Sequence, residues 1–324
     1  MDRTRSSAAR AKARASKLSV TTLLYETIHG SRAYGLAREG SDVDRKGVFV
    51  APRRAYLGFL GGPEQLEHSA DHVWFELRKL VRLACANNPT ILEMLFTEEE
   101  DRTIAHPAGQ RLIDARERFL SKRVADTFGS YALSQLGRIQ RHRRWLLTPP
   151  ERQPSRADFG LPDRTVIPKD QLGAAEALLA DGRIEEAELT PSFLAILDRE
   201  RRYRSAMKEW QQHQHWLKSR NPARAALEAA HGYDTKHAMH LVRLTRMAVE
   251  ILESGVLRVR RIHDREELLE VRDGAWSYDA LLSHVERERA RIAEAKARSV
   301  LPDAPDEDAL DALTDELASE VLGC

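Results

Sequence analysis

The chain has 324 residues, of which 42% are hydrophobic and 31% charged, enough for a sizeable core and two domains. Its 51 basic and 50 acidic residues leave a net charge of +1, which by itself predicts no strongly charged partner. The two cysteines supply neither a disulfide framework nor a CxxC metal pattern. No stretch is long and apolar enough to span a bilayer. We therefore expect a globular cytoplasmic protein with no membrane contact.

Charge is distributed unevenly along the chain. Residues 1–17 are rich in Arg and Lys, whereas residues 301–324 are rich in Asp and Glu and contain neither Lys nor Arg. We expect both ends to be solvated tails, with the basic one disordered. The basic tail suits either a nucleic-acid-binding arm or a solubilising extension.

The first hundred residues alternate between extended and irregular segments. Residues 18–28, 43–51 and 68–74 are rich in strand-forming side chains. Between the first two of these, residues 30–42 contain Gly, Ser, Arg and Glu, which favour a turn, a short helix and a second turn.

Helical spacing of apolar residues begins after Phe75 and continues to the C-terminal region. A first helix ends at Asn87-Asn88-Pro89. Further helices are expected over residues 125–146, 174–181, 201–217 and 235–253, with a proline-rich irregular connection over 148–169. The sequence thus predicts an α+β fold. A small mixed β-sheet flanked by helices covers residues 18–107, and a mainly α-helical domain covers residues 108–300.

Two short motifs near the N-terminus suit phosphoryl transfer. Asp42 and Asp44 flank one residue at the start of a predicted strand, so both carboxylates point to the same side. Such a pair can hold Mg²⁺ (or Mn²⁺) ions, which bridge phosphate oxygens. Gly30 and Ser31 follow the preceding strand, where a glycine lets the backbone approach a phosphate and the amides and hydroxyl can bind it. Arg32 could add a cation.

These motifs resemble the signature of the DNA polymerase β-like nucleotidyltransferase superfamily. The matching segments are His29-Gly30-Ser31-Arg32-Ala33-Tyr34-Gly35-Leu36 and Ser41-Asp42-Val43-Asp44-Arg45-Lys46-Gly47-Val48. More narrowly, the chain is similar to predicted nucleotidyltransferases associated with RNA repair, through segments that include Asn88-Pro89-Thr90-Ile91-Leu92-Glu93 and Tyr233-Asp234-Thr235-Lys236-His237-Ala238.

The superfamily resemblance implies a third carboxylate on a neighbouring strand. Asp71, in the predicted strand over residues 68–74, is the natural candidate, and Glu67 is the alternative if a bulge shifts the register. Glu76 falls in the first turn of a helix, where an acidic side chain interacts with the helix dipole. Glu93 also matches a family position, and either a structural pair or a role in chemistry would explain it.

The predicted helix over residues 235–253 carries Lys236, His240 and Arg243 beside its apolar stripe. These side chains could bind a triphosphate or an acceptor phosphate, or they could form a surface row with buried stems. The family resemblance favours Lys236 and His237 as site residues, with Arg243 as a further candidate.

The predicted helix over residues 125–146 mixes arginines with aromatic residues. Arg138, Arg141, His142, Arg143 and Arg144 suit a phosphate track for RNA, although charged rows on long helices are often simply solvated.

The sequence therefore predicts a metal-dependent nucleotidyltransferase. It would transfer a nucleoside monophosphate from a nucleoside triphosphate, such as ATP, to an acceptor hydroxyl. The resemblance implies an RNA end as acceptor, in repair or end modification. Transfer to a protein side chain or a small molecule would use the same centre, and an idle nucleotide- or RNA-binding module is the alternative of another class.

Overall fold

The computed structural model describes residues 21–164, 173 and 191–323, which fall into two compact units. Unit 1 combines the chain up to Ile139 with the chain from Asp234 onward, and unit 2 is residues 140–233. The division differs from the expected boundary near Pro107, because the last helices of the chain pack beside the N-terminal sheet. The predicted basic tail and the helix over residues 174–181 lie outside the described residues.

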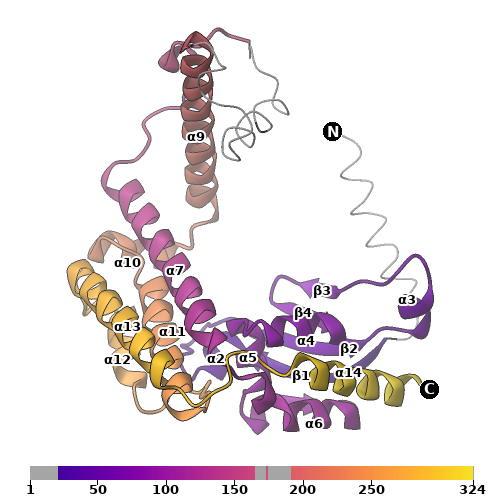
Figure 1. Cartoon of the computed structure of the whole chain (residues 1–324). Coiled ribbons are helices and arrows are strands. Elements are labelled where there is room, and N and C mark those ends of the chain that lie inside the picture. Colours follow the sequence, from indigo (N-terminus) through magenta and orange to yellow (C-terminus); the bar gives the residue numbers. More distant parts are fainter. Residues whose placement is uncertain (1–20, 165–172, 174–190, 324) are drawn as a thin grey trace. The chain divides into compact units, whose positions relative to one another are not determined.

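Unit 1 is built on a mixed sheet of five strands in the order β3-β4-β2-β1-β5. Its strands are β1 (Thr22–His29), β2 (Asp44–Val50), β3 (Gln65–Ser69), β4 (His72–Glu76) and β5 (Arg102–Ile104). Strands β1 to β4 are labelled in Figure 1. Strand β1 pairs antiparallel with β2 and β5, whereas β2 and β4 are parallel. The predicted strand over residues 68–74 is in fact part of a hairpin, because β3 and β4 turn at Ala70 and Asp71.

Strand alternation divides β2 between two faces of the sheet. Asp44, Lys46 and Val48 point to the face that the helices cover, which we call the helical face. Helices α4 (Leu77–Cys85), α5 (Pro89–Leu95) and α6 (Pro107–Asp114) pack along the sheet, and Tyr25 and Val48 are fully buried there. Intervening residues Arg45, Gly47 and Phe49 point to the opposite side, the outer face.

The outer face is covered at one end by a small apolar cluster. Helix α3 (Arg53–Leu57) contributes Ala55, which packs with Phe49 and Ala51, and Leu66 and Trp74 border them. This cluster anchors the β3–β4 hairpin to the rest of the sheet.

Helices complete both units. Unit 1 also contains the short α2 (Gly30–Ala33), the buried α11 (Thr235–Ser254), and α12 (Arg265–Arg272), α13 (Tyr278–Arg298) and α14 (Glu307–Leu322). Helix α7 (Arg123–Leu147) runs from unit 1 into unit 2, which also holds α9 (Pro191–Ser219) and α10 (Pro222–His231). The α+β class is therefore confirmed. No helix within the described ranges combines the length and apolar character that a membrane crossing requires.

The acidic C-terminal segment is a packed helix and not the tail that its composition predicts. Helix α14 lies against α4 and α6 (Figure 1) and buries Leu310 and Leu317 completely. Two of its acids, Glu316 and Glu320, pair with Arg111 at 2.6 and 2.8 Å. Leucines spaced by two helical turns give the segment one apolar side, and that side outweighs its charge.

We expect Leu317→Ala to lower the free energy of unfolding by about 2–5 kcal/mol, because it removes a fully buried side chain and leaves a cavity. Urea denaturation of the full chain measures this change. Leu57→Ala is the control: that side chain is 73% exposed, and its change should stay within about 0.5 kcal/mol. Equal effects of the two substitutions would contradict the packing of α14.

Candidate active site

The tightest contact at the candidate site is between Gly30 and Asp44. Strand β1 ends at His29, which pairs with Asp44 at the start of β2. Gly30 follows with a φ of +67°, and a Cβ placed on it would lie 2.0 Å from Oδ2 of Asp44. Only a residue without a side chain allows this carboxylate to lie against the turn. The two motifs predicted from the sequence are therefore brought together.

Asp71 lies beside Asp44, in the turn immediately before the neighbouring strand β4. Arg45 is in register with His72 in the parallel β2–β4 pair, so the preceding residues of the two strands are neighbours, and the Arg45 amide donates to the Asp71 carbonyl at 2.7 Å. The alternative, Glu67, lies one strand farther out in register with Val73. The geometry thus favours Asp71 over Glu67 as the third carboxylate.

Several charged side chains lie near Asp44 and shift the pKa of its carboxyl group. Burial raises its pKa, and the like charges of Asp71 and Asp42 raise it further, while Lys46 and Lys236 oppose the shift. A divalent cation would offset the repulsion that Asp42 and Asp71 exert on Asp44. Carboxylate oxygens are the donors that Mg²⁺ and Mn²⁺ prefer, so Asp42, Asp44 and Asp71 fit such an ion.

Lys46 is a site residue that the sequence patterns did not single out. It follows Asp44 by two positions on β2 and so shares the helical face with it. Burial lowers the pKa of Lys46, whereas the charges of Asp44, Glu93 and Asp71 raise it. A lysine in a strand is usually taken as solvent-exposed, and its spacing from Asp44 was the only signal available.

Arg32 holds the loop that carries Asp42. Its guanidinium donates to the carbonyl of Ser41 at 2.9 Å and to that of Asp42 at 3.3 Å. Arg32 itself is exposed at the edge of the site. Its first role in this structure is to fix the loop; contact with a phosphate, predicted for Arg32 and Ser31, stays a prediction.

The first turn of α11 carries Lys236 and His237, of which Lys236 is within electrostatic reach of Asp44. Lys236 is exposed, and its charge lowers the pKa of Asp44. The buried Asp234 caps this helix by accepting the His237 amide at 3.0 Å, and its second oxygen lies 2.8 Å from Nδ1 of His237. The cap therefore orients the His237 ring.

The position of Arg243 does not match the expectation that its side chain contacts a phosphate. It is 3% exposed, its guanidinium lies 3.7 Å from the centre of the Tyr34 ring, and it donates to Glu93 at 2.5 Å. Although burial works against the charged form, Glu93 raises the pKa of Arg243 overall. Arg243 is therefore the counter-charge of Glu93 inside the protein, which also supplies the role that the sequence left open for Glu93.

Besides Arg243, the Glu93 carboxylate contacts two other residues of the site. It accepts the Tyr34 hydroxyl at 2.6 Å and lies 3.7 Å from Nε2 of His29. Burial lowers the pKa of His29 to about 4, so this ring is neutral at pH 7 and the contact with Glu93 is not an ion pair. Glu93 thus ties the end of β1, the residue after α2, and α11 to α5.

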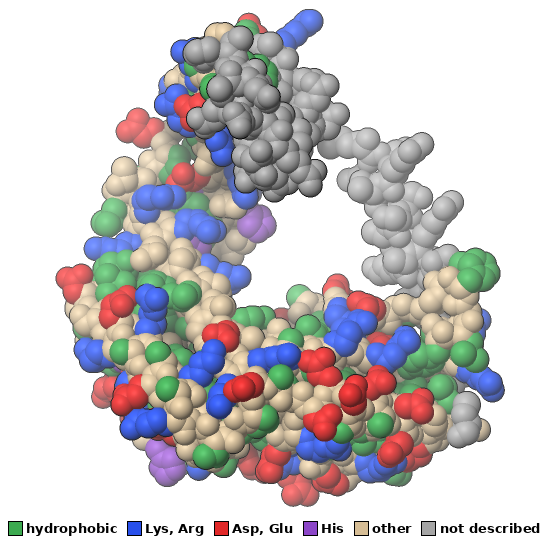
Figure 2. All heavy atoms as spheres, in the orientation of Figure 1, with side chains coloured by type: hydrophobic (Ala, Val, Ile, Leu, Met, Phe, Trp, Pro, Cys, Tyr) green, Lys and Arg blue, Asp and Glu red, His purple; other side chains and the backbone are tan. Residues whose placement is uncertain are grey.

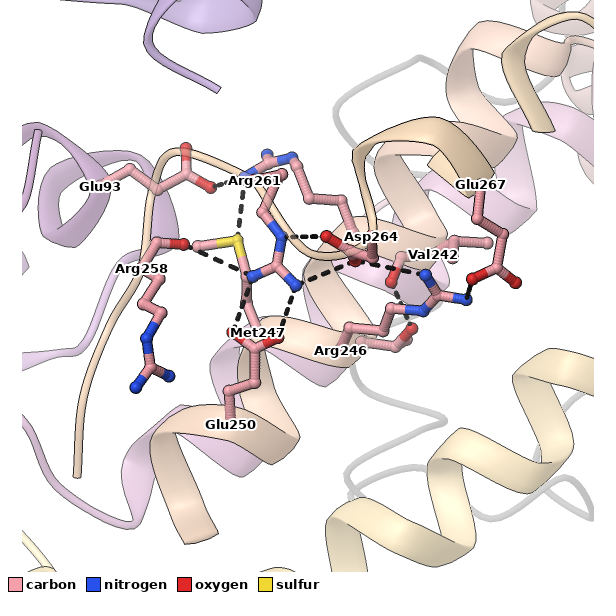
Figure 3. Close-up of polar contacts among 11 residues, drawn as sticks. Glu93, Val242, Arg246, Met247, Glu250, Arg258, Arg261, Asp264 and Glu267 are labelled. Carbon is pink, nitrogen blue, oxygen red and sulfur yellow. Dashed lines mark hydrogen bonds and ion pairs between the residues drawn. The ribbon is translucent and has the colours of Figure 1, made fainter. Parts of the chain in front are cut away.

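The loop between α11 and α12 supports the backbone that follows α2. The Arg261 amide donates to the Tyr34 carbonyl at 3.0 Å, and Arg265 donates to the Gly35 carbonyl at 2.8 Å. Figure 3 shows the guanidinium of Arg261 held between Glu250 and Asp264, while Arg246 bridges Asp264 and Glu267. These ion pairs make the support rigid.

The predicted phosphate track on α7 is largely engaged within unit 2. Arg144 pairs with Glu209, Arg143 donates to the Gly232 carbonyl at 3.0 Å, and the His142 ring stacks on Trp145. Arg138 and Arg141 are exposed. On the face that Figure 2 shows, basic and acidic side chains are interleaved and not gathered by sign.

The mixed sheet, the Gly-Ser turn and the carboxylates beside it agree with the arrangement that the sequence resemblance implies. Residues 5–146 match the model of the RNA repair pathway DNA polymerase beta family. The match supports a nucleotidyltransferase at the level of the family; it ends before Lys236 and His237. Neither a curated protein nor a solved structure gave a match.

We expect Gly30→Ala to displace Asp44 and to remove Mg²⁺-dependent stabilisation by a nucleoside triphosphate, because the new methyl group would overlap the carboxylate. Gly40→Ala is a matched control, since Gly40 has a φ of +75° but nothing within 4 Å of its added Cβ. Both variants carry the same backbone strain of about 1 kcal/mol. Thermal shift with and without Mg²⁺ and nucleotide separates them; equal losses would show that strain alone matters.

We expect Glu93→Gln and Arg243→Met each to lower the free energy of unfolding by about 3–5 kcal/mol, because each leaves an unpaired buried charge. The double variant should lose much less than the sum of the two. Urea denaturation provides this double-mutant cycle. Glu294→Gln, which breaks the exposed pair with Arg298, should change stability by no more than about 1 kcal/mol. Additive losses would contradict a direct Glu93–Arg243 interaction.

Proposed function

We propose that this chain transfers a nucleoside monophosphate from a nucleoside triphosphate to an acceptor hydroxyl and that the acceptor is an RNA end. The observation that carries the proposal is that Asp44 lies against Gly30, pairs through the start of β2 with the backbone at Asp71, and feels the charges of both Asp71 and Asp42. The family match adds support for the reaction class.

Each residue around the acids has a proposed part. The amides of Gly30 and Ser31 and the Ser31 hydroxyl would bind the triphosphate. Helix α2 has four residues, so this binding would depend on hydrogen bonds more than on a helix dipole. Lys236 would neutralise phosphate charge from the opposite side, and the ring of His237, oriented by Asp234, would contact the nucleotide or the acceptor.

Two divalent ions would be held by Asp42, Asp44 and Asp71. When bound, they would neutralise charge on the phosphates and bring the acceptor hydroxyl and the triphosphate together. The protein's own contribution is positioning. Arg32 fixes the loop of Asp42, β-sheet pairing aligns Asp44 with Asp71, and Lys46 adds a fixed positive charge on the same face.

The second candidate acceptor is a protein side chain. The acids would serve either acceptor equally, because a hydroxyl-bearing protein side chain offers the same attacking group as an RNA end. The name of the matched family, which refers to RNA repair, favours RNA.

We expect Asp44→Asn and Asp71→Asn to reduce Mg²⁺-dependent pyrophosphate release from nucleotide and RNA by at least about 100-fold, since preorganised charged groups contribute on that scale. Glu67→Gln is the control for the third carboxylate and should stay near wild type. A strong loss in Glu67→Gln with a mild one in Asp71→Asn would reassign the third acid. An Asp44→Asn variant as active as wild type would contradict the proposed metal-dependent mechanism.

The acceptor is tested with a triphosphate labelled on its α-phosphate. The nucleotide is first chosen as the one that raises the melting temperature most in the presence of Mg²⁺, since ligand binding to the native state stabilises it. Wild type and Asp44→Asn are then incubated with single-stranded RNA and with a protein mixture. Label on RNA that depends on Asp44 supports the proposal, and label on protein alone rejects the RNA acceptor.

A further inference from the structure

The outer face of the sheet carries a group of rings that the proposed chemistry does not use. His68 on β3 and His72 and Trp74 on β4 contact one another, with centroid distances of 4.7 Å for His68–His72 and 4.4 Å for His68–Trp74. His68 is exposed, and the other two are half-buried. The rings therefore form a continuous, partly solvent-exposed aromatic surface on one hairpin.

The Trp74 indole lies across the neighbouring strand. A Cβ placed on Gly47 would lie 2.6 Å from Cδ1 and 2.9 Å from Nε1 of Trp74, so the ring covers the glycine backbone closely. The indole Nε1 reaches past β2 to donate to Glu26 on β1 at 2.8 Å. Because Gly47 has no side chain, the aromatic ring can span three strands.

Glu26 fixes the orientation of this surface. Its carboxylate also lies 2.6 Å from Nε2 of His72 and accepts from Arg45 at 3.1 Å. Burial alone would raise the pKa of Glu26, but these hydrogen bonds lower it, so the carboxylate is charged at pH 7. His72, Trp74 and Arg45 are thus held in place before any ligand arrives.

The aromatic surface begins where the candidate active site ends. His72 follows Asp71, and Arg45 follows Asp44, with successive side chains pointing to opposite faces. One residue of a strand rises by about 3.3 Å. A chain that places its terminal hydroxyl at the acids can therefore turn over the start of β2 and β4 onto the outer face.

We propose that this surface, from Arg45 across Trp74 to His68, is a stacking platform for the last unpaired bases of a single-stranded RNA acceptor. Nucleobases stack on aromatic and histidine rings with little regard to sequence. Arg45, whose side chain is 49% exposed, is placed to meet a backbone phosphate. The inference rests on the proposed RNA-directed activity and gives it a site of acceptor recognition.

Two substitutions at Trp74 separate stacking from the other roles of this side chain. Trp74→Phe and Trp74→Leu both lose the hydrogen bond to Glu26, and both keep an apolar group against the Phe49 cluster. Only phenylalanine keeps an aromatic face. His68→Ala tests the exposed edge of the platform, and His263→Ala, at another exposed histidine, is its matched control.

Binding of the full chain to a 5′-fluorescein single-stranded RNA of about ten nucleotides is followed by anisotropy without nucleotide or Mg²⁺. We expect Trp74→Leu and His68→Ala to raise the Kd by about five- to 100-fold, the range expected for the loss of one base-stacking contact. Trp74→Phe and His263→Ala should remain near wild type. Each variant should keep the wild-type Mg²⁺-dependent thermal shift with nucleotide, because the acids lie on the other face.

Three results would overturn the platform. Equal losses in Trp74→Phe and Trp74→Leu would assign the effect to the Glu26 hydrogen bond. If Trp74→Leu transfers nucleotide to RNA at the wild-type rate and with an unchanged KM for RNA, the platform is rejected and the proposed function stands. Label on protein alone, with no RNA binding by wild type, would reject the RNA acceptor and the platform together.

Discussion

The buried Glu93–Arg243 pair is the interaction on which the candidate site depends. Glu93 comes from α5 and Arg243 from α11, and their atoms are 2.5 Å apart although 150 residues separate them in sequence. Tyr34 contacts both partners: its hydroxyl donates to Glu93, and the guanidinium of Arg243 lies over its ring. A buried pair of this kind requires both partners, since one charge alone would be strongly unfavourable. It therefore fixes α11, and with it Lys236, relative to the turn at Gly30.

The acidic centre has the opposite electrostatic character. Glu93 has Arg243 as its counter-charge. Asp44, in contrast, is half-buried near two further carboxylates, and only lysines offset their negative charge. A fold tolerates such crowding where a cation or ligand relieves it. The contrast between a buried charge pair and a nearby acidic cluster that lacks a full counter-charge distinguishes the supporting structure from the candidate reaction centre.

The sequence predicted those parts of the site that depend on local spacing. Gly30 and Ser31 follow one predicted strand and Asp44 begins the next, so their short separation along the chain was enough to bring them together. The predicted strand alternation does not extend to Asp42, which lies in the loop before β2. Arg243 could not be placed in this way, because its partner Glu93 is distant in sequence and a cationic row on a helix looks the same whether exposed or buried. Helix α14 was missed for a related reason: its acids dominated the composition, while the burial of Leu310 and Leu317 depends on α4 and α6.

Alternation along β2 also explains how one strand can serve two purposes. Asp44 and Lys46 face the helices and the proposed metal site, while Arg45 and Gly47 face the aromatic surface held by Glu26. A substitution at one position therefore changes one face directly and the other only through the backbone. If the outer face receives the acceptor, chemistry and recognition are separated by the thickness of a single sheet. An acceptor must then pass around the end of the strands, which requires an unpaired and flexible terminus; a rigid duplex end would not make that turn.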